Sequence, residues 1–178
     1  MSRPIPIIVC GATQKVAAMV KSNMLPEYDV VYAGHDLPST LHEVPLILAG
    51  TPPPGASLHT QLGSNDFLTS PPRAVVAGGG YGDDAFRALF AACVAACGGN
   101  ESDLPVPFFR VDNDVTARLA AEGRGPPLPE FGKGPAAAAV PGREEYSRAI
   151  AGRLKGRIGE VVGEGVGEGE GRGKVFGF

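Results

Sequence analysis

Glycines and carboxylates follow short apolar runs at several points along this 178-residue chain. Four of the runs end in glycine, and a fifth ends in Asp112, Asn113 and Asp114. Glycine lets the backbone turn without a Cβ and lets a ligand approach the backbone N–H groups. We therefore expect these positions to form one binding site. The predicted site residues of this group are Gly11, Gly50, Gly78, Gly79, Gly80 and Asp112.

The turn that begins at Gly11 carries the most chemistry. It leads into a helix N-terminus, where free backbone N–H groups and the helix dipole favour an anion. Lys15 lies in the first helical turn, where the dipole disfavours a cation unless an anion is nearby or the side chain swings into water. The sequence thus predicts a bound phosphate or other small anion, with a solvated Lys15 as the alternative. The residues of this turn are Gly11, Ala12, Thr13, Gln14 and Lys15.

This turn resembles the Gly-Ala-Thr-Gly-x-x-Gly turn of NAD(P)-binding Rossmann proteins, especially the NmrA-like and atypical short-chain dehydrogenase group. Gln14 and Ala17 stand where that family has its second and third glycines. The resemblance covers about the first 35 residues and implies NAD(P) as the cofactor. It also implies Asp36, beside His35, as the residue that reads the ribose. It gives no support to hydride transfer, because Ile150 stands four residues after Tyr146, where the Tyr-x-x-x-Lys pair has its lysine.

Five continuous runs of Val, Ile, Leu or Ala predict strands that are buried on both faces of a parallel sheet. Helical stretches separate them, which is typical of a three-layer α/β fold with an open parallel sheet and helices on both faces, Rossmann-like or flavodoxin-like. The carboxyl ends of such strands share one edge, where ligands bind. Strands are expected at Ile5–Cys10, Asp29–Ala33, Pro45–Ala49, Arg73–Ala77 and Val106–Val111.

The helical stretches have recognisable limits. Thr13 is expected to cap the first helix, and Pro26 to close it. The stretch Asp83–Cys97 is apolar almost all round, which indicates burial on more than one side. Other helices are expected near Pro38–His42, after Asn113 or Asp114, and at Arg143–Val162.

Two strand orders fit this pattern. The order 3-2-1-4-5 places the Gly11 and Gly78 turns on either side of the switch point and predicts a nucleotide or other small anionic ligand there. A protein that binds this ligand after losing its catalytic activity is a variant of the same hypothesis. The flavodoxin-like or receiver-like order 2-1-3-4-5 brings Gly11 and Gly50 together instead. It fits a non-catalytic module that forms a homodimer through the helix Phe86–Cys97.

The chain lacks the common hydrolase and kinase motifs, so no catalytic residue is predicted. His35 with Asp36, and Asp112 with Asp114, form an acid–base group only if their loops converge. The cysteines have neither a disulfide framework nor paired CxxC spacing, so we expect small buried hydrophobes and no metal site. These cysteines are Cys10, Cys93 and Cys97.

Composition restricts the partners and the location. With 16 basic and 19 acidic residues the net charge is −3, which argues against nucleic acid. The N-terminal residues do not resemble a signal peptide and no apolar run is long enough to span a membrane, so we expect a cytoplasmic protein. One domain is expected at 1–162, with a Gly/Glu-rich tail of flexible composition at 163–178. The Pro-rich segment 51–72 is expected to be a lid or an interaction surface.

Overall fold

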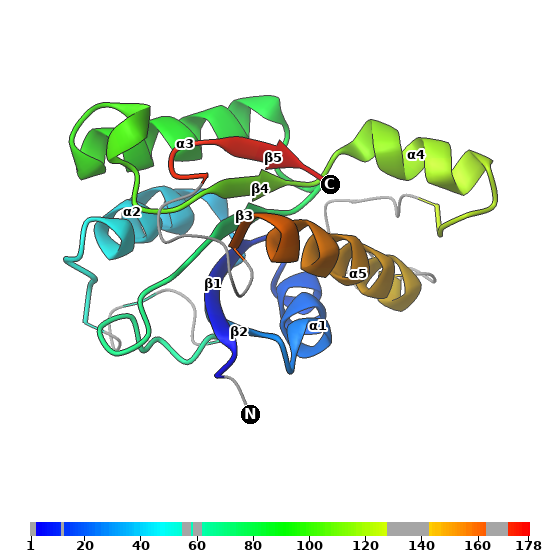
Figure 1. Cartoon of the computed structure of the whole chain (residues 1–178), viewed down its shortest axis with the longest axis horizontal. Coiled ribbons are helices and arrows are strands. Elements are labelled where there is room, and N and C mark those ends of the chain that lie inside the picture. Colours follow the sequence, from blue (N-terminus) through cyan, green and yellow to red (C-terminus); the bar gives the residue numbers. More distant parts are fainter. Residues whose placement is uncertain (1–2, 12, 55–57, 59–61, 128–142, 163–170) are drawn as a thin grey trace.

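The computed structural model contains a five-stranded, fully parallel sheet with helices on both faces (Figure 1). It describes residues 3–11, 13–54, 58, 62–127, 143–162 and 171–178. The strand order is β2-β1-β3-β4-β5, which confirms the predicted three-layer α/β fold. The strands are β1 (Ile5–Cys10), β2 (Tyr28–Gly34), β3 (Val75–Ala77), β4 (Phe108–Arg110) and β5 (Val175–Gly177).

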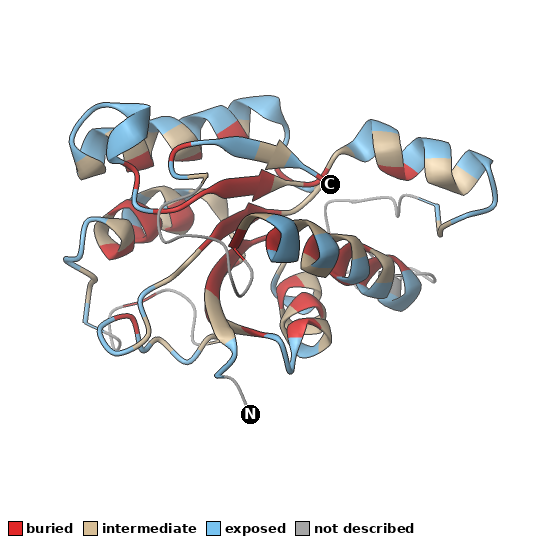
Figure 2. Ribbon diagram, viewed as in Figure 1, coloured by how far each residue is buried: buried red, intermediate tan, exposed pale blue. Residues whose placement is uncertain are grey.

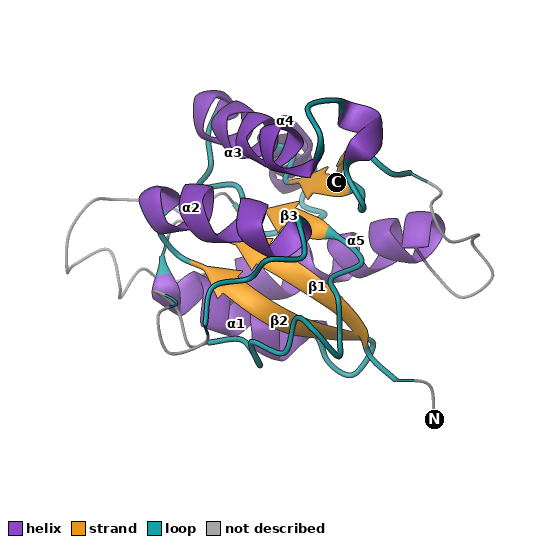
Figure 3. Cartoon of the chain, turned by 90° about the vertical axis from the view of Figure 1, so that its left-hand side faces the viewer, coloured by secondary structure: helices purple, strands orange, loops and turns teal. Residues whose placement is uncertain are grey.

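The helices form one layer on each face of the sheet (Figure 3). Helices α1 (Gln14–Met24) and α5 (Arg143–Val162) pack together on one face. Helices α2 (Leu37–Leu48) and α3 (Asp83–Cys97) pack together on the other face. Helix α4 (Asn113–Ala121) extends beyond the sheet (Figure 1). No helix in the described ranges is both long enough and apolar enough to cross a membrane.

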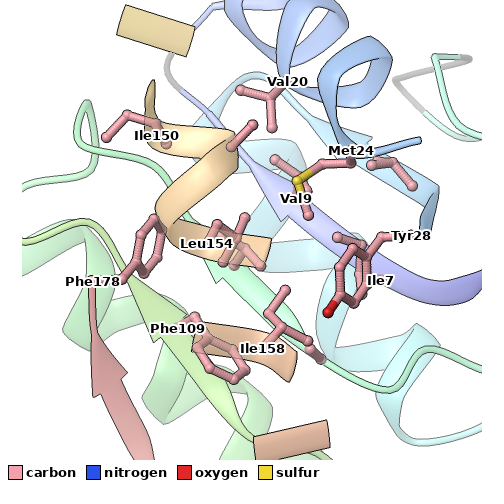
Figure 4. Close-up of a cluster of buried hydrophobic side chains, with 14 of the residues drawn as sticks. Ile7, Val9, Val20, Met24, Tyr28, Phe109, Ile150, Leu154, Ile158 and Phe178 are labelled. Carbon is pink, nitrogen blue, oxygen red and sulfur yellow. The ribbon is translucent and has the colours of Figure 1, made fainter. Parts of the chain in front are cut away.

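Buried side chains lie along both faces of the strands (Figure 2). On the α1/α5 face, Met24 and Val20 of α1 and Leu154 and Ile158 of α5 belong to the same buried cluster as Phe109 of β4 (Figure 4). Each such large side chain contributes roughly 1.5–3 kcal/mol to the free energy of folding when it is fully buried. These contacts fix α5 over the middle of the sheet.

The expected strand Pro45–Ala49 is wrong, because these residues end helix α2. Asp36 caps the helix by accepting a hydrogen bond from Ser39 N at 3.0 Å. Buried Thr40, Val44 and Ile47 then recur at spacings of four and three residues, as one face of a helix requires. Pro45 lies inside the helix and lacks a backbone donor, which costs one intrahelical hydrogen bond. The short apolar run thus fits both a strand and the end of a helix, and the capping residue Asp36 distinguishes the two.

The last residues of the expected tail form the edge strand β5, which pairs in parallel with β4. The Phe176 ring stacks on Phe109 of β4, with ring centroids 5.4 Å apart. The terminal Phe178 is buried, and its backbone N–H donates to Arg110 O at 3.2 Å. Residues 163–170 of the tail lie outside the described residues. The end of the chain is therefore part of the sheet and of its core.

The described part of the Pro-rich segment packs on the α2/α3 face. Leu58 and Phe67 are buried there, and the Phe67 ring centroid lies 6.3 Å from that of Tyr32. This part of the segment therefore contributes to the core. A role as a lid stays a prediction.

Cys10 and Cys93 are buried, as predicted, whereas Cys97 is half-buried; all three are free thiols. Burial raises the pKa of Cys93 to about 12, so this thiol stays protonated and unreactive at neutral pH. Helix α3 buries Phe86, Leu89 and Cys93. Its pairing with a second copy of the chain stays a prediction.

Candidate functional site

The turns after β1 and β3 lie side by side. The N–H of Gly78 donates to Cys10 O at 2.7 Å, and a Cβ on Gly78 would lie 3.8 Å from the Gly11 Cα. The chain leaves β1 toward β2 on one side and leaves β3 toward β4 on the other, so the switch point lies between β1 and β3. The predicted meeting of the Gly11 and Gly78 turns is confirmed.

Gly50 does not reach this edge, so its predicted place in the site is wrong. It follows the C-cap of α2, where it adopts a positive φ of 76°. The next residue, Thr51, donates its N–H to Leu46 O at 2.9 Å and closes the helix. The sheet has the order 2-1-3-4-5, but its third strand is Val75–Ala77. Residues 45–49, which were predicted to form the strand beside β1, instead end helix α2. Gly50 follows that helix and therefore does not lie beside Gly11.

A cavity of about 30 Å³ lies at the switch point, and we call it the switch-point cavity. The two glycine turns contribute to its lining, and helix α5 contributes Tyr146, Ser147 and Ile150. Sequence reasoning missed these α5 residues, because no spacing relates them to the glycines of β1 and β3. A cavity of this size holds about two waters or one small chemical group. Its described lining also includes Gly11, Thr13, Val16, Gly78, Gly79 and Gly80.

Gly79 is required by the close approach of two neighbours. A Cβ at this position would lie 2.7 Å from Asn113 Oδ1 and 2.9 Å from the Tyr146 hydroxyl oxygen. Asn113 also donates from Nδ2 to Gly79 O at 3.3 Å. The turn after β3 is thus held by residues from α4 and α5, and any side chain on Gly79 would separate them.

Ser147 is the most unusual residue of the switch-point cavity. It is 1% exposed, and its hydroxyl has no hydrogen-bond partner within the described residues. A buried polar group without a partner costs about 1–3 kcal/mol. Because Ser147 belongs to the cavity lining, a rotation of its side chain would bring this hydroxyl to a group placed in the cavity.

The N-terminus of α1 lies beside the cavity. Thr13 is its N-cap, as predicted, although the hydrogen bond from Val16 N to Thr13 Oγ1 is long at 3.4 Å. The first turn of α1 holds no acidic residue. Gln14 and Lys15 are exposed and are not among the residues that line the cavity, and Ala12 lies outside the described residues. The helix end thus offers backbone donors, while the predicted cation lies outside the cavity.

The two predicted acid–base pairs do not meet. Asp36 follows β2 and caps α2, whereas Asp112 follows β4 and caps α4. Two strands separate β2 from β4, which places their ends roughly 14 Å apart at the usual strand spacing. His35 and Asp114 therefore belong to separate parts of the edge, and the condition for an acid–base group, that the two loops converge, is not met.

A second, polar cavity of about 390 Å³ lies at the ends of β4 and β5. Arg110 pairs with Asp83 at 2.5 Å, and this hydrogen bond and charge lower the pKa of the Asp83 carboxyl. Asp112 accepts hydrogen bonds from Asp114 N at 2.9 Å and Val115 N at 3.1 Å. Asp112 caps the N-terminus of α4, whereas Asp83 lies in the first turn of α3 and bonds to Arg110. No cluster able to hold a metal ion occurs among the described residues.

Comparison with known proteins adds one relative. A protein of Aspergillus oryzae described as "Kojic acid related protein 6" is 27% identical over 151 residues, which cover 85% of this chain and 74% of that protein. No protein-family model matches the chain. No solved structure matches it either. The architecture thus defines an open parallel α/β protein with its switch point between β1 and β3.

Proposed function

We propose that this protein binds a small molecule through an anionic group at the switch-point cavity. The observation that carries the proposal is Ser147, a residue of the cavity lining whose buried hydroxyl has no hydrogen-bond partner among the described residues. The adjacent N-terminus of α1 supports the charge of the ligand, because backbone N–H groups and the helix dipole favour an anion there.

The size of the cavity restricts the ligand. About 30 Å³ accommodates one small group, so the remainder of a nucleotide would lie outside the cavity, beyond the exposed Gly80. The resemblance of the Gly11 turn to NAD(P)-binding proteins makes NAD(P) a candidate for this ligand. We propose binding without assigning a reaction, since the described lining holds no acid–base pair or metal cluster.

The test is a thermal-shift titration with NAD⁺, NADPH, AMP, FMN and inorganic phosphate. Kojic acid belongs in the same panel, because the name of the Aspergillus oryzae protein associates that protein with it. A ligand at a hundred times its Kd stabilises the folded protein by about 2.7 kcal/mol, which raises Tm measurably. We expect a rise in Tm with at least one anionic ligand.

Gly11→Val is the blocking variant. A Cβ on Gly11 meets its nearest atoms at 3.9 Å, so the fold accepts a side chain there while the cavity is filled. The matched control is Gly156→Val on α5. A Cβ on Gly156 meets nothing within 4 Å, and Gly156 is not among the residues that line the switch-point cavity. The proposal fails if no ligand raises Tm, or if Gly11→Val retains the full rise. Asp36→Ala is unsuitable as a probe, because it removes the N-cap of α2.

A further inference from the structure

A larger cavity of about 500 Å³ lies between α4 and α5, away from the glycine turns, and we call it the α4–α5 cavity. Both helices extend past the sheet on the same side (Figure 1). Leu119 and Pro126 contribute apolar surface from the α4 side, and Ala149 and Ile150 contribute it from α5. Small-molecule sites have volumes of roughly 300–1,000 Å³ and are lined mostly by apolar side chains. The α4–α5 cavity fits both criteria.

Arg153 is one of two charged residues in the described lining of this cavity, and it is the one held by a buried side chain. Its Nη2 donates to Thr116 Oγ1 at 2.6 Å, and Thr116 in turn donates to Asp112 O at 3.1 Å. Thr116 is 4% exposed, so the guanidinium is held in place by a buried hydroxyl. Among the described residues, the buried Arg153 Nε has no hydrogen-bond partner and the Arg153 guanidinium forms no ion pair. Burial lowers the pKa of Arg153 from its usual value, while interactions with Tyr146 and with the Asp112 carboxylate act in the opposite direction.

Arg124 provides a contrast within the same cavity. It is exposed and already paired with Glu122 at 3.0 Å. Arg153 instead has donors that a planar carboxylate or a sulfonate can occupy, since a guanidinium carries five N–H groups in a fixed fork. Apolar walls beside a cation that Thr116 positions, and that forms no ion pair with a described residue, favour a ligand that is apolar with a single negative charge.

We propose that the α4–α5 cavity binds a small apolar anion, such as an aromatic carboxylate or sulfonate, whose charged group pairs with Arg153. This site is separate from the switch-point cavity and does not depend on the function proposed above. Tyr146 and Ile150 line both cavities, so they are left unchanged in the test.

The test is a fluorescence titration with 1-anilinonaphthalene-8-sulfonate, an apolar anion, and with the neutral N-phenyl-1-naphthylamine. In Arg153→Gln we expect the affinity for the sulfonate to fall about tenfold or more, as for loss of a charged hydrogen bond. The affinity for the neutral probe should change less than threefold. Arg124→Gln is the matched control and should retain both affinities within about threefold, because Arg124 is exposed and paired.

A second pair of variants tests the position of the site. Gly152 lines the α4–α5 cavity and Gly156 does not, and a Cβ on either meets nothing within 4 Å. Both Gly152→Leu and Gly156→Leu should fold, because leucine favours a helix more than glycine does. Gly152→Leu should lose both probes, and Gly156→Leu should bind them as the unchanged protein does.

Three results would overturn the proposal. They are the absence of saturable binding near one probe per chain, equal sulfonate affinity in Arg153→Gln, and unchanged binding in Gly152→Leu. Melting curves of every variant identify partly unfolded protein, which would bind the sulfonate non-specifically. If no ligand raised Tm in the switch-point titration, these results would be unaffected, since none of the four substituted residues lines the switch-point cavity.

Discussion

The helix N-termini at the two ends of the carboxyl edge differ in their acidic residues. At the β3/β4/β5 end, α3 holds Asp83 and Asp84 in its first turn, and α4 is capped by Asp112 and holds Asp114. At the β1 end, α1 has a threonine cap and no acidic residue in its first turn. Carboxylates near an N-terminus neutralise the positive end of the helix dipole.

The contrast teaches where an external anion can bind. Asp112 accepts hydrogen bonds from the backbone donors of α4, whereas α3 carries Asp83 and Asp84 in its first turn without a side-chain cap hydrogen bond. The carboxylates at both helix ends repel a further negative charge. α1 is the one described helix with no carboxylate in its cap or first turn. The switch-point cavity lies beside this helix, and the polar cavity lies beside the neutralised helices.

Glycine substitutions should give the largest difference between the two ends. Gly79→Val should lower the free energy of unfolding by about 2 kcal/mol, because Asn113 can turn away but Tyr146 is 4% exposed and cannot. Gly177→Ala, at the β5 end, should change it by less than about 0.5 kcal/mol, since its Cβ meets Asp112 at 3.9 Å. Urea unfolding measures both values. Equal costs would contradict the close packing at Gly79.

The second largest difference in stability should come from removing the N-caps of α4 and α1. Asp112→Ala should cost about 1.5 kcal/mol, because Asp112 accepts hydrogen bonds from two backbone N–H groups of α4. Thr13→Ala should cost about 0.5 kcal/mol, because its single hydrogen bond is 3.4 Å long. Thermal unfolding of both variants measures the difference. A larger loss in Thr13→Ala would mean that α1 depends on its cap as much as α4 does.

Ser147→Ala should stabilise the ligand-free protein by about 1 kcal/mol, because it removes a buried hydroxyl that has no partner among the described residues. The same variant should weaken any ligand found in the switch-point titration. Calorimetry with and without that ligand measures both effects. Destabilisation of the ligand-free protein would show that the hydroxyl is satisfied by bound water.

The smallest effect should come from adding a charge to α1. Gln14→Glu places a carboxylate in its first turn and should stabilise the helix by about 0.5 kcal/mol. It should also weaken an anionic ligand at the switch point, since like charges repel. Asp114→Asn makes the opposite change in α4 and should lower Tm slightly. An anion that binds Gln14→Glu with unchanged affinity would contradict a role for the α1 dipole.

Much of the fold could be predicted where local pattern and tertiary packing agree. β1, α3 and α5 have the predicted bounds, because each carries the period of its element and a clear stop. Pro45–Ala49 failed, because a short apolar run fits a strand and the end of a helix equally well. The distinguishing signals were Asp36 as a cap and the spacing of Thr40, Val44 and Ile47.

The candidate site could be predicted in part. The glycine turns after β1 and β3 follow from the carboxyl-edge rule, and the structure places them together. Tyr146 and Ser147 could not be found, because they close the site from a helix that lies far along the chain. Their role depends on where the core fixes α5, which no local pattern contains.

The sequence by itself thus determined the class of fold, the capping of α1 by Thr13 and the glycine turns, because strand burial, helix capping and turn geometry are local properties. Only the tertiary structure determined that Gly78 rather than Gly50 joins Gly11, and that the end of the chain forms β5. It also determined that α5 covers the switch point and forms a second cavity with α4. These features depend on contacts between distant segments, whose free energy of burial outweighs the preference of any short run.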